Sequence, residues 1–215
     1  MRITPAIVFA TAITTASHAV TLGFVESFSD DTSGFGAGGP LGSVNRSVGS
    51  VQPQFSGAAD GFLEVTSNQG DRLAARAIGQ PQYSGDYVEA GVTEIRFWAI
   101  DTGTPDDAVI RVGIGDQRDN FWVSNRNWDF TDQWTLFSVD LTDESQWTQV
   151  IGSDTFEDAL RNTDVLQFRA AADPDGRQPD LIVGSFGIDN IALVPTPASA
   201  ATLTLAALAA RRRRR

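Results

Sequence analysis

Short apolar segments, separated by glycine, asparagine and aspartate, recur along most of this 215-residue chain. Within most of them apolar and polar side chains alternate, which is the period of a β-strand with one buried face. Short strands at this spacing are typical of a sandwich or a barrel. The predicted strands cover 22–28, 62–66, 73–78, 93–101, 109–115, 120–125, 135–141, 165–171 and 186–194.

One segment predicts a helix. Asp154 and Glu157 have the spacing of an acidic capping box, and Phe156 and Leu160 form an apolar pair four residues apart. The glycine-rich stretch 34–49 predicts a loop. One short helix among about ten strands predicts an all-β fold, a jelly-roll β-sandwich, for the body of the chain.

Residues 1–19 have the pattern of a secretory signal peptide. Arg2 gives a short basic start, the following stretch to residue 16 carries no charge, and Ser17-His18-Ala19 places small residues where a signal peptidase reads. Cleavage is therefore expected after Ala19, with signal peptidase as a partner during export. The alternative interpretation is a buried N-terminal strand or helix.

The last residues, 195–215, form a second distinct segment. Val194-Pro195-Thr196-Pro197 precedes an apolar run at 200–210 and five arginines, Arg211 to Arg215. The run is shorter than the roughly 20 residues of a spanning helix. Arginines stay on the cytoplasmic side because cations cross a bilayer at high cost. The chain is therefore expected to be anchored transiently in the inner membrane through this apolar helix.

This tail resembles the PEP-CTERM sorting signal of exopolysaccharide-producing Gram-negative bacteria. That signal combines a Pro-x-Pro motif, a weak apolar helix and a basic cluster; here Thr196 stands where glutamate is usual. The resemblance implies that an exosortase, a membrane transpeptidase, recognises and removes the tail. A plain C-terminal anchor is the alternative.

The composition of the body, residues 20–194, excludes several kinds of site. It carries ten arginines against 27 acids, a net charge of −17, which repels nucleic acid and anionic lipid. The chain has no cysteine or lysine, and its one histidine is His18. A Ser-His-Asp triad, a Cys-His pair and a zinc site are therefore excluded. Hard cations and two-carboxylate glycoside hydrolysis remain.

The second half of the body resembles a known family. Trp134 to Leu141, Trp147, Val165 to Arg169 and Phe186 to Leu193 are similar to the laminin IV type A (laminin B) domain and related carbohydrate-binding-like jelly rolls. The resemblance covers residues 93–194 and implies a galactose-binding-like jelly roll. It does not indicate a particular ligand.

Strand alternation predicts one polar and aromatic sheet face. At 95–99, for example, Phe97 points one way while Arg96 and Trp98 point the other. Aromatic planes beside planar polar groups suit sugar rings, which stack on the former and hydrogen-bond to the latter. The alternative is that the tryptophans pack under loops and the arginines pair with acids. The predicted ligand-binding face comprises Arg96, Trp98, Arg111, Trp122, Gln167 and Arg169.

The family resemblance also implies a structural calcium ion. In similar jelly rolls such an ion ties the start of the first strand to an aspartate of the last strand. The matching positions here are Glu26, with Asp30 or Asp31 nearby, and Asp189. Calcium takes six to eight oxygen ligands, some of them carbonyls. Surface acids at strand ends are the alternative interpretation.

These features together predict an exported, non-enzymatic structural or interaction protein of the cell surface or extracellular matrix. A carbohydrate-binding module for an extracellular polysaccharide is the second interpretation, and an exposed face of tryptophan and arginine would favour it. A secreted carboxylate-dependent glycoside hydrolase is the third. A cleft with two facing carboxylates, one with a raised pKa, would favour that reading; among 27 acids, the mere presence of a pair indicates nothing.

Overall fold

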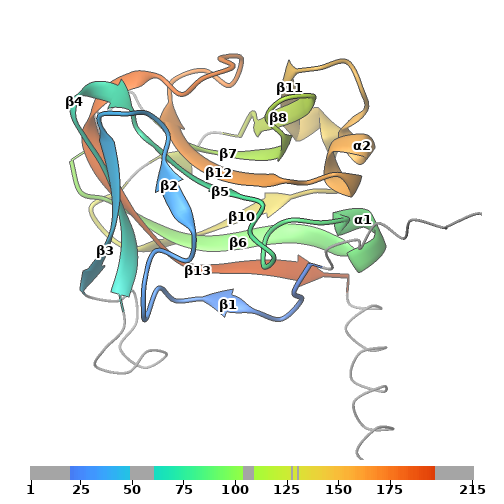
Figure 1. The fold of residues 1–215 in the computed structure, drawn as a ribbon, viewed down its shortest axis with the longest axis horizontal. Coiled ribbons are helices and arrows are strands. Elements are labelled where there is room, and N and C mark those ends of the chain that lie inside the picture. The colour runs from blue at the N-terminus through green and yellow to red at the C-terminus, as the bar shows by residue number, and fades with distance from the viewer. Residues whose placement is uncertain (1–19, 49–60, 104–108, 127, 130, 197–215) are drawn as a thin grey trace, which may run out of the picture.

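The computed structural model describes residues 20–48, 61–103, 109–126, 128–129 and 131–196. Two sheets pack face to face, and every strand pair is antiparallel (Figure 1). The predicted all-β jelly-roll sandwich is confirmed. The predicted signal peptide with Ala19, and Pro197 with the rest of the tail, lie outside the described residues.

One sheet, here called the β13 sheet, has the strand order β10-β6-β13-β4-β3, with β1 added alongside β13. Its long strand β13 runs between β6 and β4, so the last strand of the described chain lies in the middle of the sheet. The strands are β1 (Val25–Glu26), β3 (Gly42–Val48), β4 (Gly61–Arg72), β6 (Val92–Asp101), β10 (Thr135–Asp140) and β13 (Leu181–Pro195).

The opposing β12 sheet has the order β11-β8-β7-β12-β5-β2, with β9 beside β7. The chain crosses from one sheet to the other at Leu73, between β4 and β5, as a jelly roll requires. The strands are β2 (Phe35–Ala37), β5 (Ala74–Ile78), β7 (Val109–Asp116), β8 (Asn120–Ser124), β9 (Trp128–Asp129), β11 (Trp147–Ile151) and β12 (Val165–Ala171).

Aromatic rings fill the space between the two sheets. Phe97 of β6 and Phe168 of β12 meet edge to face with centroids 4.8 Å apart, and Phe35 lies 6.0 Å from Phe168. Trp147 packs its ring 5.0 Å from Phe156 and donates its Nε1–H to the carbonyl of Asp140 at 3.0 Å. The hydrogen bond satisfies the indole nitrogen, so Trp147 is buried at little polar cost.

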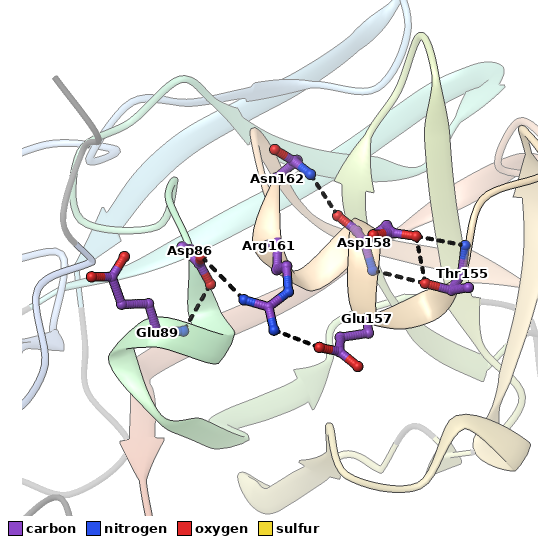
Figure 2. Close-up of polar contacts among 7 residues, drawn as sticks. All are labelled: Asp86, Glu89, Thr155, Glu157, Asp158, Arg161 and Asn162. Atoms are coloured by element: carbon purple, nitrogen blue, oxygen red, sulfur yellow. Dashed lines mark hydrogen bonds and ion pairs between the residues drawn. The ribbon is translucent and has the colours of Figure 1, made fainter. Parts of the chain in front are cut away.

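Two short helices, α1 (Tyr87–Ala90) and α2 (Phe156–Arg161), lie at one end of the sandwich (Figure 1); a single 3-10 turn spans Glu144–Gln146. The N-cap of α2 is Thr155, one residue later than the predicted capping box, and it exchanges hydrogen bonds with Asp158. Figure 2 shows Arg161 paired with Glu157 of its own helix at 2.5 Å and with Asp86, the N-cap of α1, at 3.7 Å, and the second pair joins the two helices.

The sequence prediction missed several elements. The stretch 34–49, expected as a loop, contains β2 and β3, and neither α1 nor β11 was predicted. Strand β13 runs to Pro195, and the amide of Thr196 donates to the carbonyl of Gly91 at 2.9 Å. The first residues of the proposed sorting motif, Val194 to Thr196, are therefore held by the fold. Within the described ranges, no helix has the length and apolarity needed to cross a membrane.

Arg169 of β12 holds the segment 172–180, which connects β12 to β13. Its side chain is fully buried, and its two terminal nitrogens donate to the carbonyls of Pro174 and Gly176, each at 2.8 Å. Desolvation, followed by repulsion from neighbouring Arg111, lowers the pKa of Arg169 to about 10. The guanidinium is thus a buried structural cation that binds backbone oxygens.

Arg111 of β7 lies directly opposite Arg169 in the register of the two strands. It donates to the carbonyls of Ala171 at 3.2 Å, Ala172 at 2.5 Å and Asn125 at 3.1 Å. Burial lowers the pKa of Arg111, while the acids of segment 172–180 oppose that shift. The two arginines together fix the backbone where β12 ends and segment 172–180 begins.

Replacing Trp147 with alanine should lower the free energy of unfolding by about 3–5 kcal/mol, because the ring fills the core and a cavity would remain. Trp98→Ala, on a half-buried position of the outer face of β6, should lower it by about 1 kcal/mol. Denaturant unfolding of both variants measures the difference. Equal losses would contradict the assignment of the two faces.

Arg169→Ala should lower the free energy of unfolding by about 1.5–3 kcal/mol, because buried carbonyls lose charged donors. Amide hydrogen exchange in segment 172–180 should accelerate in the same variant. The exposed Arg118→Ala is the control and should change stability by at most about 0.5 kcal/mol. Unchanged protection of 172–180 in Arg169→Ala would show that other contacts hold the segment.

Candidate functional site

The six residues predicted to share one sheet face lie on two sheets, so that prediction is wrong. Arg96 and Trp98 belong to β6 of the β13 sheet, where Arg96 forms an exposed ion pair with Glu94 at 2.6 Å. The other four lie in the β12 sheet, on the far side of the core. Alternation assigns each side chain to a face of its own strand but does not say which strands are neighbours. The four are Arg111, Trp122, Gln167 and Arg169.

Trp122 faces the core rather than the outer surface. It pairs with Ile114 across β7 and β8, packs 5.3 Å from Phe156, and donates its Nε1–H to Asn120 Oδ1 at 2.9 Å. Phe121 and Val123 therefore lie on the outer face of the sheet. Because all three consecutive residues are apolar, the alternation of this strand fits either assignment.

Arg111 and Arg169 do lie on the outer face of the β12 sheet, side by side, but their guanidinium groups are committed to backbone carbonyls. These hydrogen bonds hold the backbone in place and leave few N–H groups of the two arginines to bind a ligand. Of the predicted residues, Gln167 alone lines the hollow in this face. It is 3 % exposed and sits between Arg76 of β5 and Gly113 of β7.

We call this hollow the β12 groove. Its floor lies at Gly113, a position of β7 without a side chain. A Cβ atom on Gly113 would lie 2.5 Å from Cζ of Phe121, so only glycine lets that ring lie across β7. The side chain of Gln167 borders the same point, 3.3 Å from such a Cβ. The groove encloses about 150 Å³. Its floor is therefore formed by the Phe121 ring and the Gln167 amide.

The rim of the β12 groove comes from segments distant in the sequence. Arg72 ends β4 and hydrogen-bonds to Gln178 of segment 172–180, and Arg76 donates to Gln117 Oε1 at 3.2 Å. The segment anchored by Arg169 thus forms one wall. The lining residues are Arg72, Arg76, Arg177, Gln117, Gln167 and Gln178, together with Gly38, Phe121, Ile151 and Pro179.

Three guanidinium groups and three amides dominate this lining, and none of the described residues that line the groove is acidic. The ion pairs found among the described residues involve Arg96 and Arg161, and none involves Arg72, Arg76 or Arg177. The groove therefore offers many hydrogen-bond donors and local positive charge. It contains no carboxylate pair for general acid and base catalysis.

Sequence reasoning missed most of this lining, although one signal was present. Arg76 alternates with Ala75 and Ala77, and small apolar residues on both sides indicate a strand whose arginine points away from the core. The contributions of Arg72 and Arg177 depend on how the chain returns between the sheets, which no local pattern encodes.

A second hollow, beside α2, is acidic. It encloses about 290 Å³ and its lining includes Asp116, Asp119, Asp154 and Asp158. Hydrogen bonds from Thr155 lower the pKa of Asp158. A glycosidase needs a general acid whose pKa is raised. The lowered pKa of Asp158 is therefore the opposite of what the hydrolase interpretation requires of a general acid.

The predicted calcium residues separate into two pairs. Glu26 and Asp189 are buried on the adjacent strands β1 and β13, and β1 pairs with β13 at Ile191. Their carboxylates accept amide hydrogen bonds from Phe28 at 2.8 Å and Asn190 at 2.7 Å.

Asp30 and Asp31 are exposed in the loop after β1. Among the residues whose placement is described, no three carboxylates or imidazoles lie close enough together to hold a metal ion. Calcium binding at Glu26 and Asp189 would thus depend on backbone carbonyls for its other oxygens, and it stays a prediction.

No protein-family model and no curated protein matches the chain. Among solved structures, the family 11 carbohydrate-binding module of cellulosomal cellulase Lic26A-Cel5E of Clostridium thermocellum is similar, with a TM-score of 0.52 and 16% identity over 83% of this chain and 96% of the module. An exo-beta-agarase matches with a TM-score of 0.51 and 12% identity over 80% of this chain, but over 24% of its own. At these identities the likeness is one of fold, and it places this chain among jelly rolls similar to a carbohydrate-binding module.

Proposed function

We propose that this chain is a non-catalytic carbohydrate-binding protein whose glycan lies in the β12 groove. The observation that carries the proposal is a groove lined by arginine and glutamine on the outer face of a sheet, in a fold similar to a carbohydrate-binding module. This proposal replaces a general structural role with a specific one. The similar family 11 protein is named as a carbohydrate-binding module of a cellulase, and the agarase match covers 24% of that enzyme.

The groove would hold a sugar mainly by hydrogen bonds. Glutamine amides both donate and accept, and guanidinium groups donate, which matches the mixed donors and acceptors of sugar hydroxyls. Phe121 is only 1 % exposed, so its ring shapes the floor without offering a face for stacking. Gln167 is also nearly buried, at 3 % exposed, and a sugar would reach it only through the side-chain amide that borders the floor at Gly113.

We further propose that the protein meets its glycan outside the cell. The signal-peptide pattern at residues 1–19 and the sorting pattern at 195–215 support export, with signal peptidase and an exosortase acting on the two ends. An extracellular polysaccharide is then the natural partner. The strongly acidic body, with 27 acids and ten arginines, disfavours nucleic acid.

Glycan-array screening of the purified full-length chain should yield at least one bound polysaccharide, and Gln167→Ala should weaken that binding about tenfold. A loss of this size corresponds to about 1.4 kcal/mol, within the range for a buried hydrogen-bonding group. Titration calorimetry measures the affinity of both proteins, after thermal melts have shown that the variant is folded.

Trp98→Ala is the matched control, because Trp98 lies on the other sheet and belonged to the sequence-predicted face. It should bind as the unmodified protein does. If Trp98→Ala loses binding and Gln167→Ala does not, the glycan lies on the outer face of the β13 sheet. If no glycan on the array binds, the proposed function is wrong.

We also propose that calcium, held at Glu26 and Asp189, joins the two ends of the domain. Binding that favours the folded state would stabilise it by about 2.7 kcal/mol at a hundredfold excess over the dissociation constant. Thermal melts with calcium and with chelator should therefore differ, and Asp189→Asn should abolish the difference. The exposed Asp132→Asn should retain it. An unmoved midpoint in the unmodified protein would rule out the site.

A further inference from the structure

We propose that the glycan bound in the β12 groove is anionic, and that Arg72, Arg76 and Arg177 recognise its carboxylate or sulfate groups. This inference rests on the proposed function and adds a substrate class to it. Two observations carry it: where the arginines of this acidic domain are placed, and what lies beside them.

Most of the other described arginines have structural partners. Arg96 and Arg161 form ion pairs with glutamate, and Arg161 also with Asp86. Arg111 and Arg169 are buried against backbone carbonyls. The arginines lining the groove differ, because Arg72 donates to Gln178 and Arg76 to Gln117, both neutral side chains, and neither forms an ion pair within 4.0 Å with any described residue. The nearby carboxylate of Asp71 has a pKa lowered mainly by the amide of Leu41, and Arg72 adds a smaller electrostatic contribution.

Three of the ten arginines of the body thus meet around one hollow, in a domain with 27 acids. Acids outnumber arginines 27 to ten in the body, whereas the described residues of this lining include three arginines and no acid. A surface that needed only hydrogen bonds to neutral hydroxyls would be served by the glutamines. The arginines therefore indicate a ligand that carries negative charge.

The geometry suits such a ligand. Arg76 rises from β5 beside Gln167 on the floor, Arg72 stands at the end of β4, and Arg177 belongs to the wall formed by segment 172–180. Arg72 and Arg76 are partly exposed and Arg177 is exposed, so their charges are accessible. A guanidinium group binds a carboxylate or a sulfate through two parallel hydrogen bonds, which gives direction as well as attraction.

The surroundings also limit the kind of polyanion. Segment 172–180 carries Asp173, Asp175 and Asp180 beside Arg177, and the body as a whole has 27 acids. A densely charged polymer such as DNA would meet this negative field along its length. A polysaccharide with one charge per sugar, separated by neutral hydroxyls, would meet the three arginines where its charge lies and glutamine amides elsewhere.

The direct test compares polymers that differ only in charge. We expect the purified full-length chain to bind polygalacturonate at least tenfold more tightly than its methyl ester, which has the same backbone without the negative charge. A dextran sulfated to about one group per sugar, compared with neutral dextran, is the second pair and tests whether sulfate can replace carboxylate. Titration calorimetry at two salt concentrations should show weaker binding at the higher one, because salt screens exposed charges.

Variants locate the interaction. Arg76→Gln should weaken binding of the charged polymer about tenfold, Arg72→Gln and Arg177→Gln should each weaken it several-fold, and Arg76→Lys should retain part of it. Arg96→Gln is the charge-matched control, because it removes one positive charge from the opposite sheet, and it should bind normally. Thermal melts of every variant separate lost binding from lost folding.

The outcomes are distinguishable from those of the proposed function. Binding of a neutral glycan at the groove, weakened by Gln167→Ala and unaffected by Arg76→Gln or salt, would overturn the anionic assignment and leave carbohydrate binding intact. Binding of single-stranded DNA as tight as that of polygalacturonate would also overturn it, because the groove would then be a general polyanion site. Absence of binding to every charged and neutral glycan would overturn both proposals.

Discussion

The hydrogen bonds from Arg169 to the carbonyls of Pro174 and Gly176 determine the shape of the outer face of the β12 sheet. They convert a nine-residue connection between β12 and β13 into a wall. Without that wall the β12 sheet would present a shallow surface, and Arg177 and Gln178 would have no fixed position beside Arg72. Burial of a guanidinium is unfavourable by itself, and the carbonyls offset the lost hydration.

The arginines therefore serve two purposes on the same face. Arg111 of β7 and Arg169 of β12 donate to backbone carbonyls, whereas Gln167, two residues before Arg169 on β12, and its partner Arg76 on β5 line the groove. Arg111 and Arg169 differ from Gln167 and Arg76 because they lie close to the end of β12, where the carbonyls of segment 172–180 are within reach. Gly113 of β7 also shapes the groove. Because it has no side chain, the ring of Phe121 can lie across β7 and form the floor.

Strand alternation predicted the fold well and the site poorly, for the same reason. In each predicted strand, such as 93–101 or 165–171, the alternation of apolar and polar residues shows which side chains share a face. Many short strands of this kind predict a sandwich. Which strands become neighbours depends on crossings such as the one at Leu73, and these have no local signature. Arg96 and Gln167 were therefore assigned to one face although the core separates them. For Trp122, flanked by Phe121 and Val123, even the face of its own strand was undetermined.

Strand β13 is the last described strand and also the central strand of its sheet, paired with β4 along its first half and β6 along its second. Any tension applied at Thr196 would therefore act along β13, parallel to the strand. The backbone hydrogen bonds of an antiparallel ladder run across the strands, so such tension loads them in shear and they must yield together. A domain tethered through this end would resist being pulled apart far better than one tethered through an edge strand, whose bonds can open one after another.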